Sequence, residues 1–390
     1  MMGFGAFITC GADNHPLPAD IAECLLEVRV EQTIGEATHY GVRVRDDLSE
    51  GSPMASKAAE LAAGAMLGIS VENGDGMVCL VRGPITDTKL KSTVGGPGST
   101  FEVHGSDRCI ELDRKSVTGT WSGKASDAAQ MIIGSLGATP DVQTTQRSYD
   151  SRSGTLNQSG TALEFIRQIA RENGMHFWLS YKVKRDPLDL TGTNLKIEEV
   201  ANFKTSPPRS DSALGALASA LPVMLAPADG VVLRPQVGDD CGHNVSSFEI
   251  NADQERLTKA TVAAIDLSSI KVQSNEARSK VSPMASGGTP LEKQQSDEHS
   301  MQPRAAGDPE DVQRRAEAAL AEQAFNVSAH GSTTFYMLRG LLLPHEIVSV
   351  DRLGPESSVP FRVRKVTHVI TPTDHYMDFE LQTNAKGSSK

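Results

Sequence analysis

Alternation of apolar and polar residues over residues 25–46 constrains the fold of this chain more than any other feature. Val28 and Val30 alternate with charged residues, and after a polar stretch Val42 and Val44 repeat the pattern among arginines. A period of two places one face of a strand against a core and the other face in water. We therefore predict a β-hairpin here, in a segment built of antiparallel sheet.

The rest of the N-terminal segment, 1–108, carries further strand signals. Strands are predicted at 68–72, 77–90 and 99–105, and an Asn-Gly-Asp-Gly turn joins the first two, because Asn and Gly tolerate positive φ. The Ala-rich residues 57–66 are predicted to form one short helix. We expect the whole segment to be a small antiparallel barrel or sandwich.

The segment 109–200 changes to the period of helices. A first helix is expected to begin at a Ser126 cap and to end at Gly137. A second helix opens with the capping box formed by Thr161 and Glu164, and a strand follows it. This middle part is therefore predicted to be α+β. The expected buried stripes are Ala128, Met131, Ile132 and Leu136 in the first helix, and Ala162, Phe165, Ile166, Ile169 and Ala170 in the second.

The C-terminal part begins with an insertion of unclear structure at 201–250, which has no sustained period. Within 251–386, residues 276–308 are polar and are predicted to form a long exposed loop. A helix is predicted at 308–324, where Asp-Pro suits a helix start, with Val312, Ala316, Ala319 and Leu320 as its apolar face. Strands return at 346–351, 360–371 and 376–383, in a pattern similar to that of the N-terminal segment. We therefore predict two related β-barrels on either side of an α+β middle.

Composition limits the class of partner. The chain has 38 Lys and Arg against 49 Asp and Glu, a net charge of −11, which disfavours binding to nucleic acid or to an anionic membrane. No apolar stretch reaches the ~18 residues that span a bilayer. The five cysteines are scattered without a CxxC pair, and no secretory signal is recognisable, so we expect reduced thiols in a protein made in a cytoplasm.

Motifs for nucleotide, metal or nucleophilic chemistry are incomplete. Residues 95–98 are Gly-rich but lack the lysine of a phosphate loop, and 134–137 lack the spacing of a nucleophile elbow. Cys241 and His243 have no second ligand pair at a zinc spacing. His368 falls in a predicted strand, which favours a packed or hydrogen-bonded role over that of a general base. We name no catalytic, cofactor-binding or metal-ligating residue, and no cofactor.

Other polar and aromatic residues have structural interpretations. Glu198 and Glu199 are adjacent, so on a strand they point to opposite faces, which does not suit a glycosidase pair. His345 is not followed by the second His of a metalloprotease helix. Without a basic groove, the aromatic strand around Trp178 indicates core rather than a base-stacking platform. Trp121 is predicted to pack on the helix that follows it.

A series of short motifs follows an order that resembles a known family. They are FEVHGSD at 101–107, LDR at 112–114, TWSGKASD at 120–127, GTALEFI at 160–166, NGMHF at 173–177, VRKVTHVI at 363–370 and HYMDFEL at 375–381. The order resembles the tail-hub family of contractile phages, which includes late control protein D and the N-terminal hub part of VgrG spike proteins. The resemblance covers residues 20–200 and 250–385. The chain departs from the family at Pro344-His345, where Pro-Gly is frequent, and at 204–247, which has no counterpart.

The resemblance implies a mainly β, α+β fold with two tail-tube-like antiparallel β-barrels and an inserted α+β domain. The parts would be the first barrel at 1–108, the α+β domain at 109–200, the insertion at 201–250 and the second barrel at 251–386. It also implies a homotrimer whose six barrels match a sixfold tail tube, while its threefold symmetry seats a central spike. Closing the ring would cover the edge strands of each barrel.

The resemblance further implies a structural, non-enzymatic protein of the virion tail baseplate or of an injection particle, assembled in the host bacterial cytoplasm. Its expected partners are itself, the tail tube protein, the central spike protein and other baseplate components, with no membrane and no sequence-specific nucleic acid. DNA would pass through a lumen whose negative charge avoids phosphate contacts. Because the chain ends at Lys390, just after the last hub strand, the spike is expected to be a separate polypeptide.

Two alternatives remain open from the sequence. The first is a baseplate adaptor that recruits effectors or binds receptors, with 204–247 and 276–308 as the candidate specialised segments. The second is a tail-associated cell-wall hydrolase, which would need an acid–base pair or a metal site in a cleft. Motifs for such chemistry are not found, so the hub is the preferred interpretation.

Overall fold

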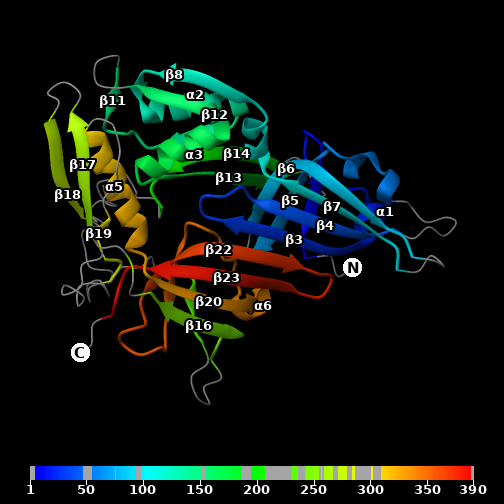
Figure 1. Ribbon diagram of the computed structural model, residues 1–390. Coiled ribbons are helices and arrows are strands. Elements are labelled where there is room, and N and C mark those ends of the chain that lie inside the picture. The colour runs from blue at the N-terminus through cyan, green and yellow to red at the C-terminus, as the bar shows by residue number, and fades with distance from the viewer. Residues whose placement is uncertain are drawn as a thin grey trace.

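One sheet of thirteen strands runs through both ends of the chain (Figure 1). The computed structural model describes residues 5–46, 55–74, 76–93, 98–150, 155–185, 195–206, 230–235, 242–253, 256, 259–266, 271–278, 283–285, 300–301 and 309–387. In these residues the strand order is β16-β20-β23-β22-β3-β4-β7-β6-β5-β1-β2, with β15 and β21 attached beside β22. The predicted mainly β, α+β class is confirmed.

The N-terminal half of the sheet follows the predicted alternation. Val28, Val30, Val42 and Val44 are all buried, and β3 pairs with β4 so that Val28 lies opposite Val42. This half comprises β1 (Phe7–Cys10), β2 (His15–Pro16), α1 (Ala19–Ala22), β3 (Leu25–Thr33), β4 (His39–Arg45), β5 (Met66–Asn73), β6 (Gly76–Lys91) and β7 (Thr100–Ser106). The strands predicted at 68–72, 77–90 and 99–105 are therefore confirmed as β5, β6 and β7.

The single helix predicted at 57–66 is wrong. Two short 3-10 turns, Ala55–Lys57 and Ala59–Leu61, occupy the region instead. Extended backbone at Ala58 and at Ala62 interrupts the helical path, and Gly64 then takes a φ of +87° before β5 begins. Glycine adopts this conformation at little steric cost, so the Ala-rich composition does not extend into a helix.

The C-terminal half of the sheet joins the N-terminal half along one seam. Strand β22 pairs antiparallel with β3, and His368 lies opposite Val30. The half comprises β15 (Val232–Leu233), β16 (Ser247–Ala252), β20 (Val327–Thr334), α6 (Phe335–Leu338), β21 (Ile347–Val350), β22 (Pro360–Ile370) and β23 (His375–Thr383). The seam makes one continuous path of strands, and no closed barrel is found within the described part of the chain.

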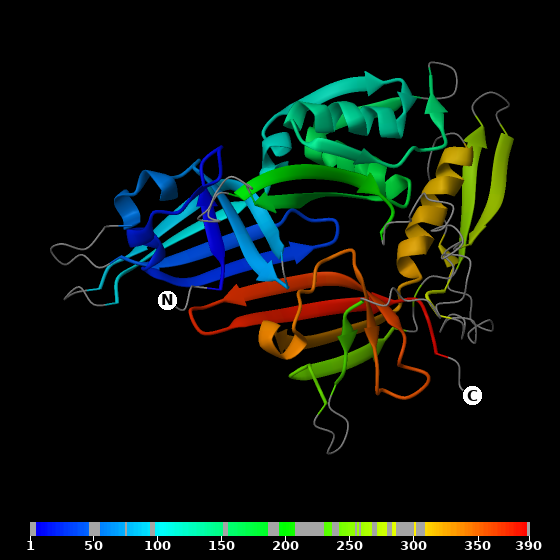
Figure 2. The same ribbon diagram turned by 180° about the vertical axis from the view of Figure 1, so that it is seen from behind.

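The α+β unit packs helices against a small sheet of order β10-β14-β13 and encloses its own hydrophobic core. It comprises a 3-10 turn at Arg108–Asp113, then β8 (Ser116–Trp121), β9 (Gly123–Lys124), α2 (Ala125–Leu136), β10 (Thr139–Val142), β11 (Ser148–Tyr149), β12 (Leu156–Thr161), α3 (Ala162–Glu172), β13 (His176–Arg185) and β14 (Leu195–Lys204). Strand β14 thus extends four residues into the segment predicted to be an insertion. In both views this unit lies above the junction of the two sheet halves (Figures 1 and 2).

The capping residues predicted for the two helices of this unit are confirmed for α3 but not for α2. Helix α3 starts with the predicted capping box, in which the Thr161 hydroxyl accepts from the Glu164 N–H at 3.1 Å and the Glu164 carboxylate accepts from the Thr161 N–H at 2.9 Å. Helix α2 begins earlier than predicted, because Asp127 accepts a hydrogen bond from the Lys124 N–H while Ser126 is buried. Met131, predicted to be buried, is 62% exposed.

A small α+β unit occupies part of the segment that was predicted to belong to the second barrel. It contains β17 (Lys259–Asp266), β18 (Lys271–Arg278), β19 (Ser300–Met301) and α5 (Pro309–Gln323), and its core is formed by Ala260, Ala277, Val312, Ala316 and Leu320. Residues 276–278 and 300–301 are therefore strand and not loop, while most of 279–308 lies outside the described residues. Ala319, predicted on the apolar face of α5, is exposed.

Helix α5 lies against α3, on the side away from the N-terminal half of the sheet (Figure 2). Within the insertion, the structure describes 201–206, 230–235 and 242–250, and the rest of it is outside the described residues. None of the helices that the structure describes combines the length and the hydropathy needed to cross a membrane.

Candidate functional site

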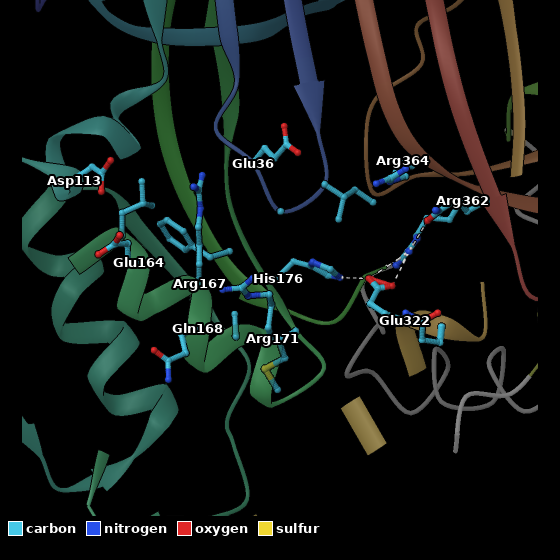
Figure 3. Close-up of a pocket in the computed structure, with 18 of the residues that line it drawn as sticks. Glu36, Asp113, Glu164, Arg167, Gln168, Arg171, His176, Glu322, Arg362 and Arg364 are labelled. Carbon is cyan, nitrogen blue, oxygen red and sulfur yellow. Dashed lines mark hydrogen bonds and ion pairs between the residues drawn. The ribbon is translucent and has the colours of Figure 1, made fainter. Parts of the chain in front are cut away.

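A cavity of about 970 Å³ lies where the two sheet halves, the α+β unit and the small unit meet (Figure 3). Its walls come from α3, from the turn between β3 and β4, from the C-terminal end of α5, and from β22 and β23. The elements that form it are separated by up to several hundred residues of chain, so folding of all four parts is needed to build it.

Charged side chains dominate the wall of this cavity. Five arginines face four carboxylates. Glu164 is engaged in the capping box of α3, and Asp113 accepts a hydrogen bond from the Thr161 hydroxyl at 2.6 Å. The arginines are Arg167, Arg171, Arg256, Arg362 and Arg364. Hydrogen bonds from the neutral groups of Thr161 leave the negative charge of both carboxylates in place, so the arginines outnumber the carboxylates on this wall by only one.

The third carboxylate, Glu322, is held by a histidine and an arginine. It accepts from His176 Nε2 at 3.1 Å and from the Arg362 guanidinium at 3.0 Å, as the dashed lines in Figure 3 show. Burial alone would raise the pKa of Glu322, but the hydrogen bond from His176 and the charge of Arg362 outweigh it and lower the pKa to about 2. This group joins α5, β13 and β22, and therefore connects three of the four parts around the cavity.

Arg362 is the most deeply buried cation of the group. Its side chain is 3% exposed, and its guanidinium lies 3.9 Å from the centroid of the Phe325 ring. It also donates to Gln382 at 3.1 Å and to the Ser206 carbonyl at 3.2 Å. A buried guanidinium is tolerated when hydrogen bonds and an aromatic face replace its water, which is the situation here.

His345 lies behind the cavity and links β13 to the start of β21. Its ring stacks on Trp178 with 3.7 Å between centroids, and its Nδ1 is 2.9 Å from the Ser206 hydroxyl. Burial, followed by the charges of neighbouring cations, holds the pKa of His345 well below its usual range. Its φ is +72°, a conformation that glycine adopts more readily than histidine.

A second buried ionic group joins the α+β unit to the N-terminal half of the sheet. Glu199 on β14 accepts from Arg82 on β6 at 2.5 Å and from Arg108 at 2.8 Å. Arg82 also donates to Asn14 at 2.7 Å, and its carbonyl accepts from the Tyr181 hydroxyl at 3.2 Å. The prediction that Glu198 and Glu199 face opposite sides of a strand is confirmed, since Glu198 bonds instead to the exposed Thr139 hydroxyl.

The other residues singled out by sequence have structural roles where the structure describes them. His368 is fully buried, and its Nδ1 lies 3.0 Å from Nε2 of His375, which confirms a hydrogen-bonded role. Trp121 stacks on Phe165 of α3 at 6.0 Å between ring centroids and packs against the core that α2 and α3 share. Cys241 lies outside the described residues, as do 95–97. Among the residues described, no group of three or more His, Cys, Asp or Glu is arranged to hold a metal ion.

Sequence reasoning did not find the two ionic groups. Arg82 and Glu199 are 117 residues apart, and each stands alone in its own strand pattern. Arg362 alternates with the buried Phe361 and Val363 and therefore lies on the other face of β22, where a charged residue is the ordinary expectation, so its burial gave no signal in the sequence. A buried charged residue requires a partner, but the sequence does not say where along the chain that partner lies.

Comparison with known proteins identifies the fold. No protein-family model matches the chain, and no curated protein matches its sequence. Among solved structures, it is similar to a tail protein from Neisseria meningitidis MC58, with a TM-score of 0.61 and 13% identity over 97% of this chain and 96% of that chain. It is also similar to a 43 kDa tail protein of prophage MuSo2 from Shewanella oneidensis, with a TM-score of 0.62 and 10% identity over 97% and 98% of the chains.

A third similarity is to a chain of the Francisella PdpA–VgrG complex, with a TM-score of 0.54 and 8% identity. It spans 99% of this chain and 53% of that one. At these identities the comparison defines the fold alone: over 97% of its length, the chain has the fold of the two tail proteins. The resemblance to the tail-hub family, first indicated by short motifs, is therefore confirmed at the level of fold.

Proposed function

We propose that this protein is the structural baseplate hub of a contractile phage tail or of a related injection system. The observation that carries the proposal is the match of nearly the whole chain to two tail proteins that it also resembles in length. A partial match could reflect one shared domain, whereas a match over 97% of this chain includes both sheet halves, the α+β unit and the seam between them.

In this proposal three copies surround the tail axis, and each contributes two sheet halves to a ring of six. The ring meets a sixfold tail tube on one side, and its threefold symmetry seats a central spike on the other. The two ends of the described sheet, β16 and β2, are edge strands, and neighbouring copies that covered them would remove an aggregation hazard. The partners are the tail tube protein, the spike and other baseplate proteins, and the location is the virion tail baseplate, assembled in the host bacterial cytoplasm.

We also propose that the role is non-enzymatic. A cell-wall hydrolase needs a carboxyl group that exchanges protons near neutral pH in an open cleft. In the cavity, the pKa of Glu322 is lowered to about 2, so this carboxyl group stays ionised near neutral pH. A hub uses such groups to hold its parts together. The adaptor function is the second candidate, because the cavity presents arginines to the outside.

Electron microscopy of the purified chain tests the hub proposal. Class averages should show a threefold ring with six similar lobes around a central opening. Particles of the size of a single chain, at concentrations where tail proteins assemble, would contradict it. The exposed apolar Ile250 on edge strand β16 offers a variant: Ile250→Lys should reduce ring formation, whereas Val117→Lys, on β8 of the α+β unit, should not.

A further inference from the structure

The two halves of the large sheet repeat one strand order. The N-terminal half runs β3-β4-β7-β6-β5 and the C-terminal half runs β16-β20-β23-β22-β21, with antiparallel pairing throughout both series. Strand β6 has a register shift against β7 between Ile85 and Asp87, and β22 has one against β23 between Val363 and Lys365. Because both the order and the place of this shift agree, β22 is the counterpart of β6, and β16 is the counterpart of β3.

The internal seam joins only one of the two combinations that this repeat offers. It pairs residues 365–370 of β22 with residues 28–33 of β3, along the edge of β22 that β23 leaves free. The corresponding edge of β6, over residues 86–91, has no partner strand in the described part of the chain, because the pairing of β5 with β6 ends at Pro84. Strand β16, the counterpart of β3, also has a free edge, since it is the outermost strand of the C-terminal half (Figure 1). Each copy therefore has one seam formed and both edges of a second seam open.

The correspondence between the halves extends residue by residue. Starting from the two register shifts, a row of cross-strand partners in the N-terminal half matches a row in the C-terminal half: Asp87, His104, Gly41 and Arg29 match Lys365, Glu380, His330 and Glu249. Counting along the strands from these rows, Leu90 is the counterpart of His368, and Ile250 is the counterpart of Val30. His368 and Val30 lie opposite each other in the internal seam.

We infer that β6 of one copy pairs antiparallel with β16 of a second copy, in the register of the internal seam, so that Leu90 lies opposite Ile250. Leu90 is 52% exposed and Ile250 is 36% exposed, whereas their counterparts His368 and Val30 are fully buried. Leu90 lies opposite the buried Phe101 of β7 and therefore points to the core side of the sheet, because directly paired residues share a face. Pairing between copies would bury Leu90 and Ile250 as the internal seam buries their counterparts.

The charged residues of the two edges are compatible with this register. Lys91 lies opposite Glu249, so that opposite charges meet across the two strands. Asp87 would lie beside Asp253, but Asp253 follows the end of β16, and its carboxylate already accepts from the Arg256 guanidinium at 2.9 Å. The edge of β2, at the other end of the sheet, is a poorer site, because this strand has two residues and one is a proline without a backbone N–H.

This pairing specifies how the proposed hub would close. Three contacts between β6 and β16, together with three internal seams, would join six sheet halves in a ring, because each copy offers one edge of either kind to a different neighbour. The inference rests on the proposed hub function for the presence of neighbouring copies, whereas its register comes from the internal repeat of this chain.

Disulfide cross-linking of the double variant Leu90→Cys, Ile250→Cys tests the inference. Directly opposite residues of antiparallel strands have Cα atoms about 4.5–5.5 Å apart, a separation that a disulfide spans. On oxidation the variant should run as a covalent trimer on a non-reducing gel and return to the single chain on reduction, while each single variant should remain a single chain. The control Leu90→Cys, Asn251→Cys should cross-link about tenfold less, because the side chain of residue 251 points to the other face of the strand.

Charge reversal adds a test that does not depend on cysteines. Lys91→Glu and Glu249→Lys should each weaken the association of copies about two- to fivefold for each contact, and the double variant should recover it. In the wild type, hydrogen exchange at residues 86–91 and 247–252 should slow as the protein concentration is raised and the copies associate. This measurement keeps the test valid if a variant fails to fold, which the thermal midpoint of each variant shows.

The outcomes separate this inference from the hub itself. Rings that form without a disulfide between residues 90 and 250, or equal cross-linking in the Asn251→Cys control, would overturn the inference and leave the hub standing. Cross-linked chains that grow beyond three copies would support the strand pairing and contradict the closed hub. Neither rings nor cross-links, with unchanged hydrogen exchange at all concentrations, would contradict both.

Discussion

Removing the charge of Glu199 should destabilise the contact between the α+β unit and the N-terminal half of the sheet. In Glu199→Gln the side chain keeps its shape, but Arg82 loses the carboxylate that lies 2.5 Å away. Arg82 is 11% exposed, so water does not replace that partner. Arg108 loses one contact as well, yet it retains its ion pair with Glu111 at 3.0 Å. The main consequence is therefore one uncompensated buried guanidinium, at Arg82.

The expected size of the effect follows from the burial of this pair. Removing one partner of a buried ion pair costs about 3–5 kcal/mol, because the remaining charge stays buried without its counter-charge. At ~4–8 °C for each kcal/mol in a unit of about 100 residues, the thermal midpoint of the α+β unit should fall by roughly 12–40 °C. The unit that unfolds first should be the α+β unit, since Glu199 lies in its central strand β14.

Differential scanning calorimetry measures this change directly, with Glu198→Gln as the control. Glu198 is the adjacent carboxylate on the same strand, but it faces the other side and bonds to an exposed hydroxyl. Its variant should unfold within about 2 °C of the wild type, as expected for an exposed contact. Equal midpoints for the two variants would refute the reasoning. The double variant Arg82→Leu, Glu199→Leu should recover much of the loss, because it leaves no unpaired charge.

Three further predictions concern other parts of the chain. Gly83→Ala should lower the free energy of unfolding, measured by urea titration, by about 1–3 kcal/mol, because a Cβ at this position would collide with the carbonyl of Ser106 in β7. Gly119→Ala is the control: a Cβ there meets no atom within 4 Å, so the free energy of unfolding should not fall. Burial lowers the pKa of His368 to about 3 and that of His375 to about 4. Below pH 6.5 the unfolded chain therefore binds more protons than the folded chain, and the thermal midpoint should fall as the pH decreases from 6.5 to 5. A constant midpoint over this range would contradict the prediction. Thr161→Val should cost about 1 kcal/mol and speed hydrogen exchange in the first turn of α3, and unchanged exchange would show that the cap is not needed.

Most of the local structure could be predicted from the sequence, because periodicity and capping act over a few residues. The hairpin at 25–46 and the α3 capping box are confirmed in detail. Local signals failed where two of them competed. At α2 the carboxylate of Asp127 caps the helix in place of the hydroxyl of Ser126, and this moves the helix start.

Contacts between distant segments could not be predicted, because their partners lie on separate strands with no shared pattern. The pairing of β22 with β3 joins the two ends of the chain in one sheet, and a strand does not show in its sequence which edge it will join. The cavity has the same origin: Arg167, Arg362 and Glu322 come from three parts of the chain. Sequence identified each of these only as a charged residue within its own element.

The mass of the purified chain in solution, measured by light scattering, tests the central claim most directly. A hub that adapts sixfold to threefold symmetry should form a trimer of about 125 kDa, three times the 41.6 kDa of one chain. On dilution, the mass should fall from that of the trimer to that of one chain without a plateau at the mass of a dimer. A mass of one chain at every concentration would contradict the proposed hub.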